Sequence, residues 1–236
     1  MGNIIEIKNL HFAYGKHEVL HGVNIAIAPK EIVGLVGLNG SGKSTLLDTI
    51  CNVKKQSAGE IFVAGEQGSR NVKKLIGYMP QSFGLFHDLT VWENIKYIST
   101  VYGIFDNDVI EQIIKTCRLD AYKNVYASNL SGGYKQLLSL ACALVHNPKI
   151  LILDEPTSAM DPIFRAQFWD IVHSYNNKDT TILVTTHYLE EMSKTDRIIL
   201  LDAGKIAWQG KYEDLQGEEL IKIYNRHTDV NDEKTV

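Results

Sequence analysis

Short apolar runs, separated by glycines and polar turns, mark the first third of the chain. Runs of this length, bounded by turn residues, are typical of β-strands. They fall at residues 4–7, 23–27, 32–36 and 59–65. The beginning of the chain is therefore predicted to be mostly β-structure, with short connections.

The spacing of apolar residues becomes helical in the second quarter of the chain. The residues that recur at intervals of three to four are Val91, Ile95, Ile98 and Tyr102. This is the period of one helix face, and a second helix is predicted near residues 107–118. Residues 84–130 are therefore expected to form a mostly helical lobe.

Helices and strands alternate through the remaining sequence. Ser131 opens a long helix predicted to reach about Asn147, where Pro148 ends it. Strands are then predicted at 150–153, 181–185 and 197–201, and helices at 162–175 and 188–195. Such alternation predicts a mostly parallel sheet with helices on both faces. We expect one domain over residues 1–226, followed by a polar tail at 227–236.

Composition and charge exclude several classes of protein. Hydrophobic residues make up 44% of the chain and charged residues 22%, as in ordinary globular domains. The formal net charge of −4 gives no electrostatic reason to expect nucleic-acid binding. The longest aliphatic runs, 150–153 and 198–201, fall far short of the ~20 residues that span a bilayer. With no signal-like start and three scattered cysteines, the chain is expected to be cytoplasmic.

The strand predicted at 32–36 runs directly into a glycine-rich segment. That segment is Gly37-Leu38-Asn39-Gly40-Ser41-Gly42-Lys43-Ser44-Thr45. Its glycines let successive N–H groups face anionic oxygens, and the helix predicted at 44–52 directs its positive dipole end to the same place. Lys43 adds a cation for the β- and γ-phosphates, and the Ser44 hydroxyl can bind Mg²⁺. The segment predicts a P-loop; the alternative is a loop that only turns the chain.

Two carboxylates follow the strand predicted at 150–153. At the carboxyl end of a buried strand, Asp154 and Glu155 stand where open α/β sheets bind their ligands. Asp154 is predicted to reach a Mg²⁺ ion, through water, and Glu155 to polarise a water in line with the γ-phosphate. On their own they could equally be an ordinary strand end. About a hundred residues after a P-loop, they indicate nucleotide hydrolysis.

A third motif is Leu130-Ser131-Gly132-Gly133, at the start of the long predicted helix. By itself it could be an ordinary helix cap. Between a P-loop and an Asp-Glu strand, it resembles the signature of the nucleotide-binding subunits of ATP-binding cassette (ABC) transporters, over about residues 3–215. The resemblance implies an α/β fold: a P-loop NTPase core with a mostly parallel sheet, an N-terminal antiparallel β subdomain and an inserted α-helical lobe.

The resemblance also implies roles for residues whose own signals are weak. Tyr14 is similar to the family's aromatic residue that stacks on adenine, and Gln81 to the glutamine that touches Mg²⁺ and the attacking water. His187 resembles the histidine at the γ-phosphate, and Asp161 belongs to a loop, 158–161, that crosses between subunits. Without the resemblance, Tyr14 would be an ordinary strand aromatic and Gln81 an ordinary polar loop residue. His187 would be a capping or core histidine, and Asp161 part of an ordinary loop.

Two positions depart from the family pattern. Leu137 stands where a basic residue is usual, and Met160 where leucine is usual. Neither change removes a group that does chemistry, and we expect Leu137 to pack in the interior instead.

In this family, the signature helix of one subunit closes on the γ-phosphate held by the P-loop of another. The resemblance therefore implies ATP and Mg²⁺ as ligands, a second ATPase subunit, and a polytopic membrane permease that holds the chain peripherally at the inner face of the cell membrane. An apolar group after Gln81 is either lobe core or the groove for this permease; its members are Phe83, Leu85, Phe86 and Leu89.

The segment 81–94 is similar to exporter-type subunits, and we expect no long C-terminal regulatory region after the cassette. ATP-driven export is therefore expected. A small importer subunit and a soluble ABC ATPase with an assembly or maintenance role are the alternatives.

Overall fold

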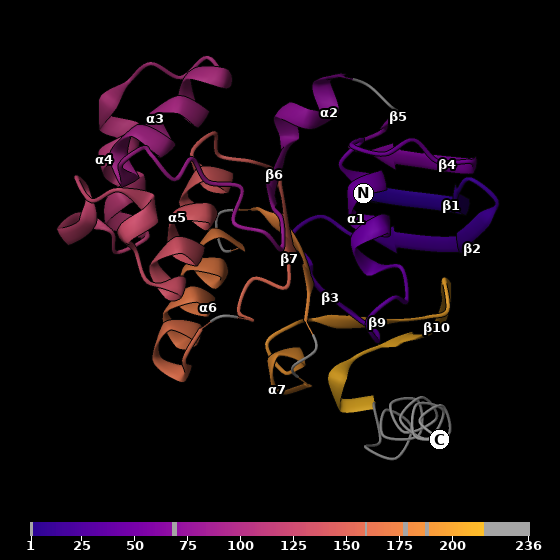
Figure 1. Cartoon of the computed structure of the whole chain (residues 1–236). Helices are drawn as coiled ribbons and strands as arrows, with labels where there is room; N and C mark the ends of the chain where they lie inside the picture. The colour runs from indigo at the N-terminus through magenta and orange to yellow at the C-terminus, as the bar shows by residue number, and fades with distance from the viewer. Residues whose placement is uncertain (1, 68–69, 159, 177–178, 187–188, 215–236) are drawn as a thin grey trace, which may run out of the picture.

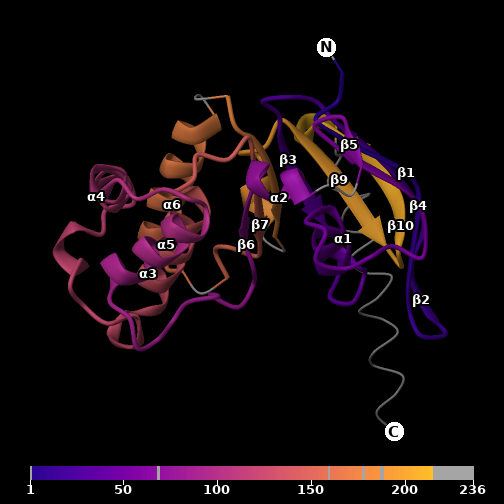
Figure 2. The same cartoon turned by 90° about the horizontal axis from the view of Figure 1, so that it is seen from above.

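Two β-sheets and the helices around them build the molecule (Figure 1). The computed structural model describes residues 2–67, 70–158, 160–176, 179–186 and 189–214. Figure 2 shows the sheets and α1 on one side, and α3, α4, α5 and α6 on the other.

The first sheet is antiparallel and has the strand order β2-β1-β4-β5. Its strands are β1 (Ile5–Tyr14), β2 (His17–Ile27), β4 (Ala58–Val63) and β5 (Glu66–Gln67). The antiparallel β subdomain is thus confirmed, but β1 and β2 are longer than predicted. They continue past their apolar ends because Tyr14 still pairs with His17 across a tight turn.

The second sheet has the order β10-β9-β3-β8-β7-β6 and is parallel except for β10. Its strands are β3 (Ile32–Val36), β6 (Ile76–Met79), β7 (Ile150–Asp154), β8 (Thr181–Thr185), β9 (Arg197–Asp202) and β10 (Lys205–Gly210). The mostly parallel sheet is confirmed, whereas β6 and β10 were not predicted. The carboxyl ends of β3, β7 and β8 meet at one edge, which is where the P-loop and the acidic pair begin.

The helices follow the predicted order with shifted ends, except that α2 was not predicted. They are α1 (Lys43–Ile50), α2 (Arg70–Leu75), α3 (Val91–Val101), α4 (Asn107–Thr116), α5 (Gly132–Leu144), α6 (Pro162–Asn176) and α7 (Leu189–Met192). The predicted end of α5 at Asn147 was three residues too late, because Asn147 has a left-handed φ of 49° and cannot continue the helix. Within the described residues there are also three short 3₁₀ turns, at Asp120–Tyr122, Ala127–Asn129 and Tyr212–Asp214.

Strand β7 separates two hydrophobic cores. Leu151 and Leu153 face a core shared with the helical lobe, whereas Ile150 and Ile152 face a core shared with α1 and the antiparallel sheet. Successive side chains of a strand point to opposite faces, so an uninterrupted aliphatic run serves both cores. This burial fixes where β7 ends and therefore where its two carboxylates emerge.

The buried side chain of Asn94 attaches the loop before α3 to the helical lobe. Asn94 Oδ1 accepts a hydrogen bond from the Phe86 amide (2.9 Å), and its Nδ2 donates to the carbonyl oxygens of Phe86, Leu89 and Thr90. A capping box between Thr90 and Glu93 starts α3 beside it. The segment after Gln81 therefore has a defined path.

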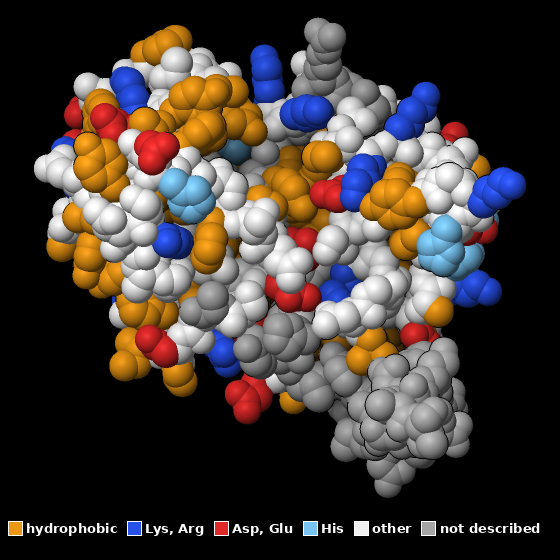
Figure 3. Space-filling model, in the orientation of Figure 1, with side chains coloured by type: hydrophobic (Ala, Val, Ile, Leu, Met, Phe, Trp, Pro, Cys, Tyr) orange, Lys and Arg blue, Asp and Glu red, His pale blue; other side chains and the backbone are white. Residues whose placement is uncertain are grey.

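The apolar group after Gln81 is divided between core and surface. Leu85 packs against the core of the helical lobe, whereas Phe86 is 45% exposed and meets the ring of Tyr97 edge-on at 4.7 Å. Figure 3 shows hydrophobic side chains gathering on this face of the lobe, over α3. Further exposed apolar residues of α3 and of the turn after it are Val101, Tyr102 and Phe105.

Leu137 is fully buried in the core of the helical lobe, so the expectation that it packs in the interior is confirmed. Among the helices of the described ranges, none combines the length and the hydrophobicity needed to cross a bilayer.

Candidate functional site

The glycine-rich loop between β3 and α1 adopts a conformation that larger residues would oppose. Gly40 and Gly42 have left-handed φ values of 83° and 105°, which favour glycine. A Cβ on Gly37 would lie 2.2 Å from the carbonyl oxygen of Leu201. The loop can therefore curl closely against β9, and its amides line an open space.

Lys43 lies inside this curl. Its Nζ donates hydrogen bonds to the carbonyl oxygens of Gly37 (2.8 Å) and Leu38 (3.1 Å) and lies 4.0 Å from Glu155 Oε1. Burial lowers the pKa of the ammonium, while the charges of Glu155 and Asp154 act in the opposite direction. The result is a buried cation held at the mouth of the loop by carbonyls and carboxylates.

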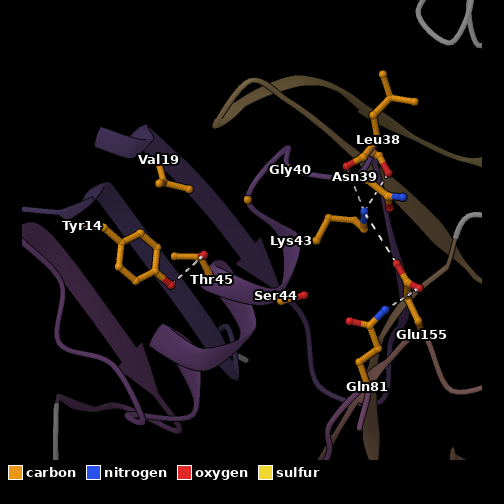
Figure 4. Close-up of a pocket in the computed structure, with 12 residues that line it drawn as sticks. Tyr14, Val19, Leu38, Asn39, Gly40, Lys43, Ser44, Thr45, Gln81 and Glu155 are labelled. Carbon is orange, nitrogen blue, oxygen red and sulfur yellow. Dashed lines mark hydrogen bonds and ion pairs between the residues drawn. The ribbon is translucent and has the colours of Figure 1, made fainter. Parts of the chain in front are cut away.

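The acidic pair at the end of β7 is fixed by its neighbour strand. The hydroxyl of Thr185 donates to Asp154 Oδ1 (2.6 Å), and the amide of Glu155 donates to the same hydroxyl oxygen (2.8 Å). Burial raises the pKa of Asp154, and hydrogen bonds from the Thr185 and Ser44 side chains oppose this shift. Glu155 itself has a φ of 46°, an unusual value for a residue other than glycine. The chain turns sharply here and directs the Glu155 side chain toward the loop (Figure 4).

Gln81 reaches the site from the end of β6. Its Nε2 donates to Glu155 Oε2 at 3.1 Å. In Figure 4, Gln81, Glu155 and Lys43 point toward one another on one side of α1, and Tyr14 lies on the other. The segments that follow β3, β6 and β7 therefore bring together a cation, an amide and a carboxylate.

These groups line a cavity of about 690 Å³. Its volume is within the range of ~300–1,000 Å³ that is common for small-molecule and cofactor sites. The lining residues are Tyr14, Val19, Gly37, Leu38, Asn39, Gly40, Gly42, Lys43, Ser44, Thr45, Gln81 and Glu155.

Tyr14 forms the end of the cavity that is remote from Glu155. Its ring is 49% exposed and touches Phe12 edge-on at 4.9 Å. Its hydroxyl lies 3.5 Å from Thr45 Oγ1 and accepts a hydrogen bond from Lys54 Nζ at 2.5 Å. An exposed aromatic face is thus available for a planar ligand at this end.

The residues fit a nucleotide. The first turn of α1 carries no acidic side chain, so its amides and dipole favour an anion. Within the described part of the chain, the buried Ser41 Oγ has no hydrogen-bond partner, and it belongs to the loop that such an anion would occupy. Oxygen donors from Ser44, Gln81 and Asp154 suit Mg²⁺, which is usually held by few protein ligands together with phosphate oxygens and water.

Six of the predicted site residues in the described part of the chain do not line the cavity. They are Ser131, Gly132, Gly133, Asp161, Ser41 and Asp154. The first three form the start of α5, in the helical lobe. Asp161 caps α6, since its Oδ1 accepts hydrogen bonds from the amides of Ile163 (2.9 Å) and Phe164 (3.0 Å). His187 lies outside the described residues.

Sequence reasoning missed two residues of the site. Thr185 closes the end of β8 and bonds to both acidic residues; it stands two residues before His187, which could have drawn attention to it. Val19 lines the cavity from β2. No local pattern marks it, because its place depends on how the hairpin of β1 and β2 lies over the P-loop.

Comparison with known proteins gives the family. A model described as ABC transporter matches residues 20–158. A probable multidrug ABC transporter ATP-binding protein of Escherichia coli, YbhF, is 37% identical over 91% of this chain, which spans only 38% of that protein. The Nod factor export ATP-binding protein I of Rhizobium etli is 34% identical, with 93% of this chain and 73% of that protein covered. A probable sulfate/thiosulfate import ATP-binding protein of Chlorella vulgaris matches as well, with 34% identity over 89% of this chain and 92% of that protein.

Comparison with solved structures leads to the same family. A solved dimer of the ATP-binding cassette MJ0796, in a post-hydrolysis state with ADP and Pi, superposes with a TM-score of 0.81 at 27% identity. The alignment covers 88% of this chain and 98% of that one. By sequence and by fold, the chain belongs to the ABC transporter family, as one of its ATP-binding cassettes.

Proposed function

We propose that this chain is the ATP-binding and ATP-hydrolysing subunit of a transporter and drives export of a substrate through a separate membrane permease. The observation that carries the proposal is the cavity in which the P-loop, Lys43, Gln81 and Glu155 converge, with Tyr14 at its far end.

Each residue of the cavity has a role in this proposal. The amides of the loop and the Lys43 ammonium bind the β- and γ-phosphates, and the Tyr14 ring stacks on adenine. The Glu155 carboxylate accepts a proton from the attacking water, and Gln81, hydrogen-bonded to Glu155 at 3.1 Å, helps to orient that water. His187 is assigned to the γ-phosphate on the family resemblance.

Ser44, Gln81 and Asp154 would hold Mg²⁺. When bound, the ion neutralises charge on the phosphate oxygens. Asp154 is prepared for such a role because it is buried and fixed by Thr185 at 2.6 Å.

A second copy of the chain, or a related ATPase subunit, would complete the site. The start of α5, with Ser131, Gly132 and Gly133, has no acidic residue in its first turn and lies away from the chain's own cavity. Two such chains arranged head to tail would bring each signature, together with Asp161, to the other chain's nucleotide. ATP would then close the dimer and hydrolysis would reopen it, because cleavage removes the γ-phosphate that both chains bind.

The permease is expected to dock on the helical lobe, where Phe86 and Tyr97 are exposed beside the segment that leads from Gln81. The chain would then lie at the cytoplasmic, inner face of the cell membrane. Export is favoured by the segment 81–94 and by the multidrug and export names of relatives. Import is the second candidate, favoured by the import relative. Recovery of a polytopic membrane protein with the chain would support transport, whereas full solubility without one would favour a soluble ATPase of assembly or maintenance.

Substitution of Glu155 by glutamine tests the hydrolytic role. Glu155→Gln keeps the size of the side chain but removes the proton acceptor, so hydrolysis should fall by ~10²-fold or more while ATP binding is retained. Phosphate release and nucleotide affinity are measured with Mg²⁺ present. The exposed Glu60→Gln serves as a control that should hydrolyse ATP normally. Normal turnover by Glu155→Gln would contradict the assigned base.

A further inference from the structure

A side chain that does not line the cavity contacts the Tyr14 side chain at the cavity's far end. Lys54 follows α1, and its Nζ lies 2.5 Å from the Tyr14 hydroxyl oxygen and 2.8 Å from Asp48 Oδ2. Asp48 belongs to α1, the helix that begins at the phosphate loop. One ammonium therefore connects the Tyr14 side chain to helix α1.

The partners of Lys54 are themselves fixed. Asp48 Oδ1 accepts a hydrogen bond from the half-buried Tyr78 hydroxyl at 3.0 Å. The amides of Val53 and Lys54 both donate to the carbonyl oxygen of Asp48, which sets the path of the turn after α1. The Lys54 side chain is only 34% exposed. The backbone and the partners of Lys54 are therefore held in place where its side chain contacts Tyr14.

The electrostatics agree with this arrangement. Hydrogen bonds to Asp48 and Tyr14 raise the pKa of Lys54, and the hydrogen bond from Lys54 is the main reason that the pKa of the Tyr14 phenol is lowered. Lys54 is therefore a stable cation that donates separate hydrogen bonds to a carboxylate and to a phenol oxygen.

We propose that Lys54 is a positioning residue for the base end of the nucleotide: it holds the half-exposed Tyr14 ring ready for stacking and connects it, through Asp48, to the helix that follows the phosphate loop. The proposal rests on the proposed function of the cavity. Its physical reason is preorganisation, because a ring that is already fixed loses less conformational entropy when a base stacks on it.

Lys54→Met tests the proposal, with Lys55→Met as the matched control. Both substitutions remove one positive charge, and Lys55 is the exposed neighbour. ATP affinity of Lys54→Met should be about 3- to 10-fold weaker than that of the control, with an equal rise in KM and little change in kcat at saturating ATP. Lys54→Arg should restore most of the affinity, because it keeps a cation between Tyr14 and Asp48.

Inorganic tripolyphosphate separates positioning from general charge effects. It has the phosphates but no base, so its affinity should be the same for Lys54→Met and Lys55→Met. Equal losses of ATP and tripolyphosphate affinity would overturn the proposal, as would an ATP affinity of Lys54→Met that matches the control.

Tyr14→Phe gives an independent variant, because it keeps the ring and removes the oxygen that Lys54 contacts. Adding Lys54→Met to Tyr14→Phe should change ATP affinity no more than Lys55→Met does; a full additional loss would overturn the proposal. A wild-type chain that binds and hydrolyses ATP while Lys54→Met behaves as its control would refute the role of Lys54 alone. A wild-type chain that does neither would refute the proposed function.

Discussion

Lys43 and Asp154 are both buried, and burial opposes the charged form of each. It lowers the pKa of the ammonium and raises that of the carboxyl group. Thr185 compensates Asp154 only in part, through one hydrogen bond of 2.6 Å. In the free chain the negative charge of Asp154 is therefore destabilising, and a bound cation would offset it. Residues held this way for ligand binding commonly reduce the stability of the free protein.

Replacement of Asp154 by asparagine should reveal this cost. Asp154→Asn retains an oxygen to accept the Thr185 hydrogen bond but has no charge to bury, so the melting temperature of the nucleotide-free chain should rise at neutral pH. Mg²⁺-dependent ATP hydrolysis should be lost. Calorimetry and phosphate release measure the two effects.

The pH dependence of that stability difference follows from the sign of the shift. The raised pKa means that folded Asp154 takes up a proton at a higher pH than the unfolded chain does. The penalty is thus fully present above the folded pKa and disappears as the pH falls toward the unfolded value. The advantage of Asp154→Asn should shrink on acidification; a constant or growing advantage would contradict this account.

At the scale of the elements, helix α5 depends on close contact with α6. A Cβ on Gly133 would lie 2.8 Å from the Phe164 ring, and this ring also meets Tyr134 edge-on at 4.8 Å. Phe164 lies in the first turn of α6, and its amide donates a hydrogen bond to Asp161 Oδ1 at 3.0 Å. The glycine of the signature thus lets its helix start pack directly on the element that follows the acidic strand.

Gly133→Ala should therefore destabilise the chain. Alanine is favoured over glycine within a helix by about 1 kcal/mol, but overpacking of a filled site typically costs ~1–3 kcal/mol, and here the ring is enclosed by Tyr134. We expect a lower melting temperature and slower hydrolysis, with ATP affinity of the single chain unchanged because Gly133 does not line the cavity.

The double variant Gly133→Ala/Phe164→Leu is the control for this clash. Leucine gives back the space that the new methyl group takes, so part of the lost stability should return. Calorimetry compares the stability of the single and the double variant. A Gly133→Ala chain as stable and active as the wild type would contradict close packing of Gly133 against Phe164.

Whether a feature could be predicted from the sequence depended on whether it lies within one element or between elements. The P-loop and the Asp154-Glu155 pair were predictable because their functional groups belong to consecutive residues next to a buried strand. Strand β6 was not, because its four residues owe their strand form to pairing with β7. Val19 and Lys54 reach the site only through the folding of distant segments over α1. Local motifs could therefore be predicted from the sequence, whereas contacts made by tertiary packing could not.

At the scale of the whole molecule, the proposal assigns two different halves of a site to each chain. The phosphate loop and Glu155 lie at the sheet edge, whereas Ser131 lies at the start of α5 in the helical lobe, outside the cavity lined by the described residues. In the proposed head-to-tail dimer, each active site would combine the cavity of one chain with the signature of the other.

A mixing experiment tests this division. Lys43→Ala should disable a chain's own cavity, and Ser131→Arg should disable the signature that it offers to its partner, so each variant alone should be inactive. In an equal mixture, half of the dimers carry both variants, and one of their two sites pairs an intact cavity with an intact signature. Activity should return to about one quarter of the wild-type level if the sites work independently. A mixture of Lys43→Ala with Glu155→Gln is the matched control: both defects lie in the cavity half, so no intact site can form and no activity should return. Equal recovery in both mixtures, or none in the first, would mean that the two halves of the site do not come from different chains.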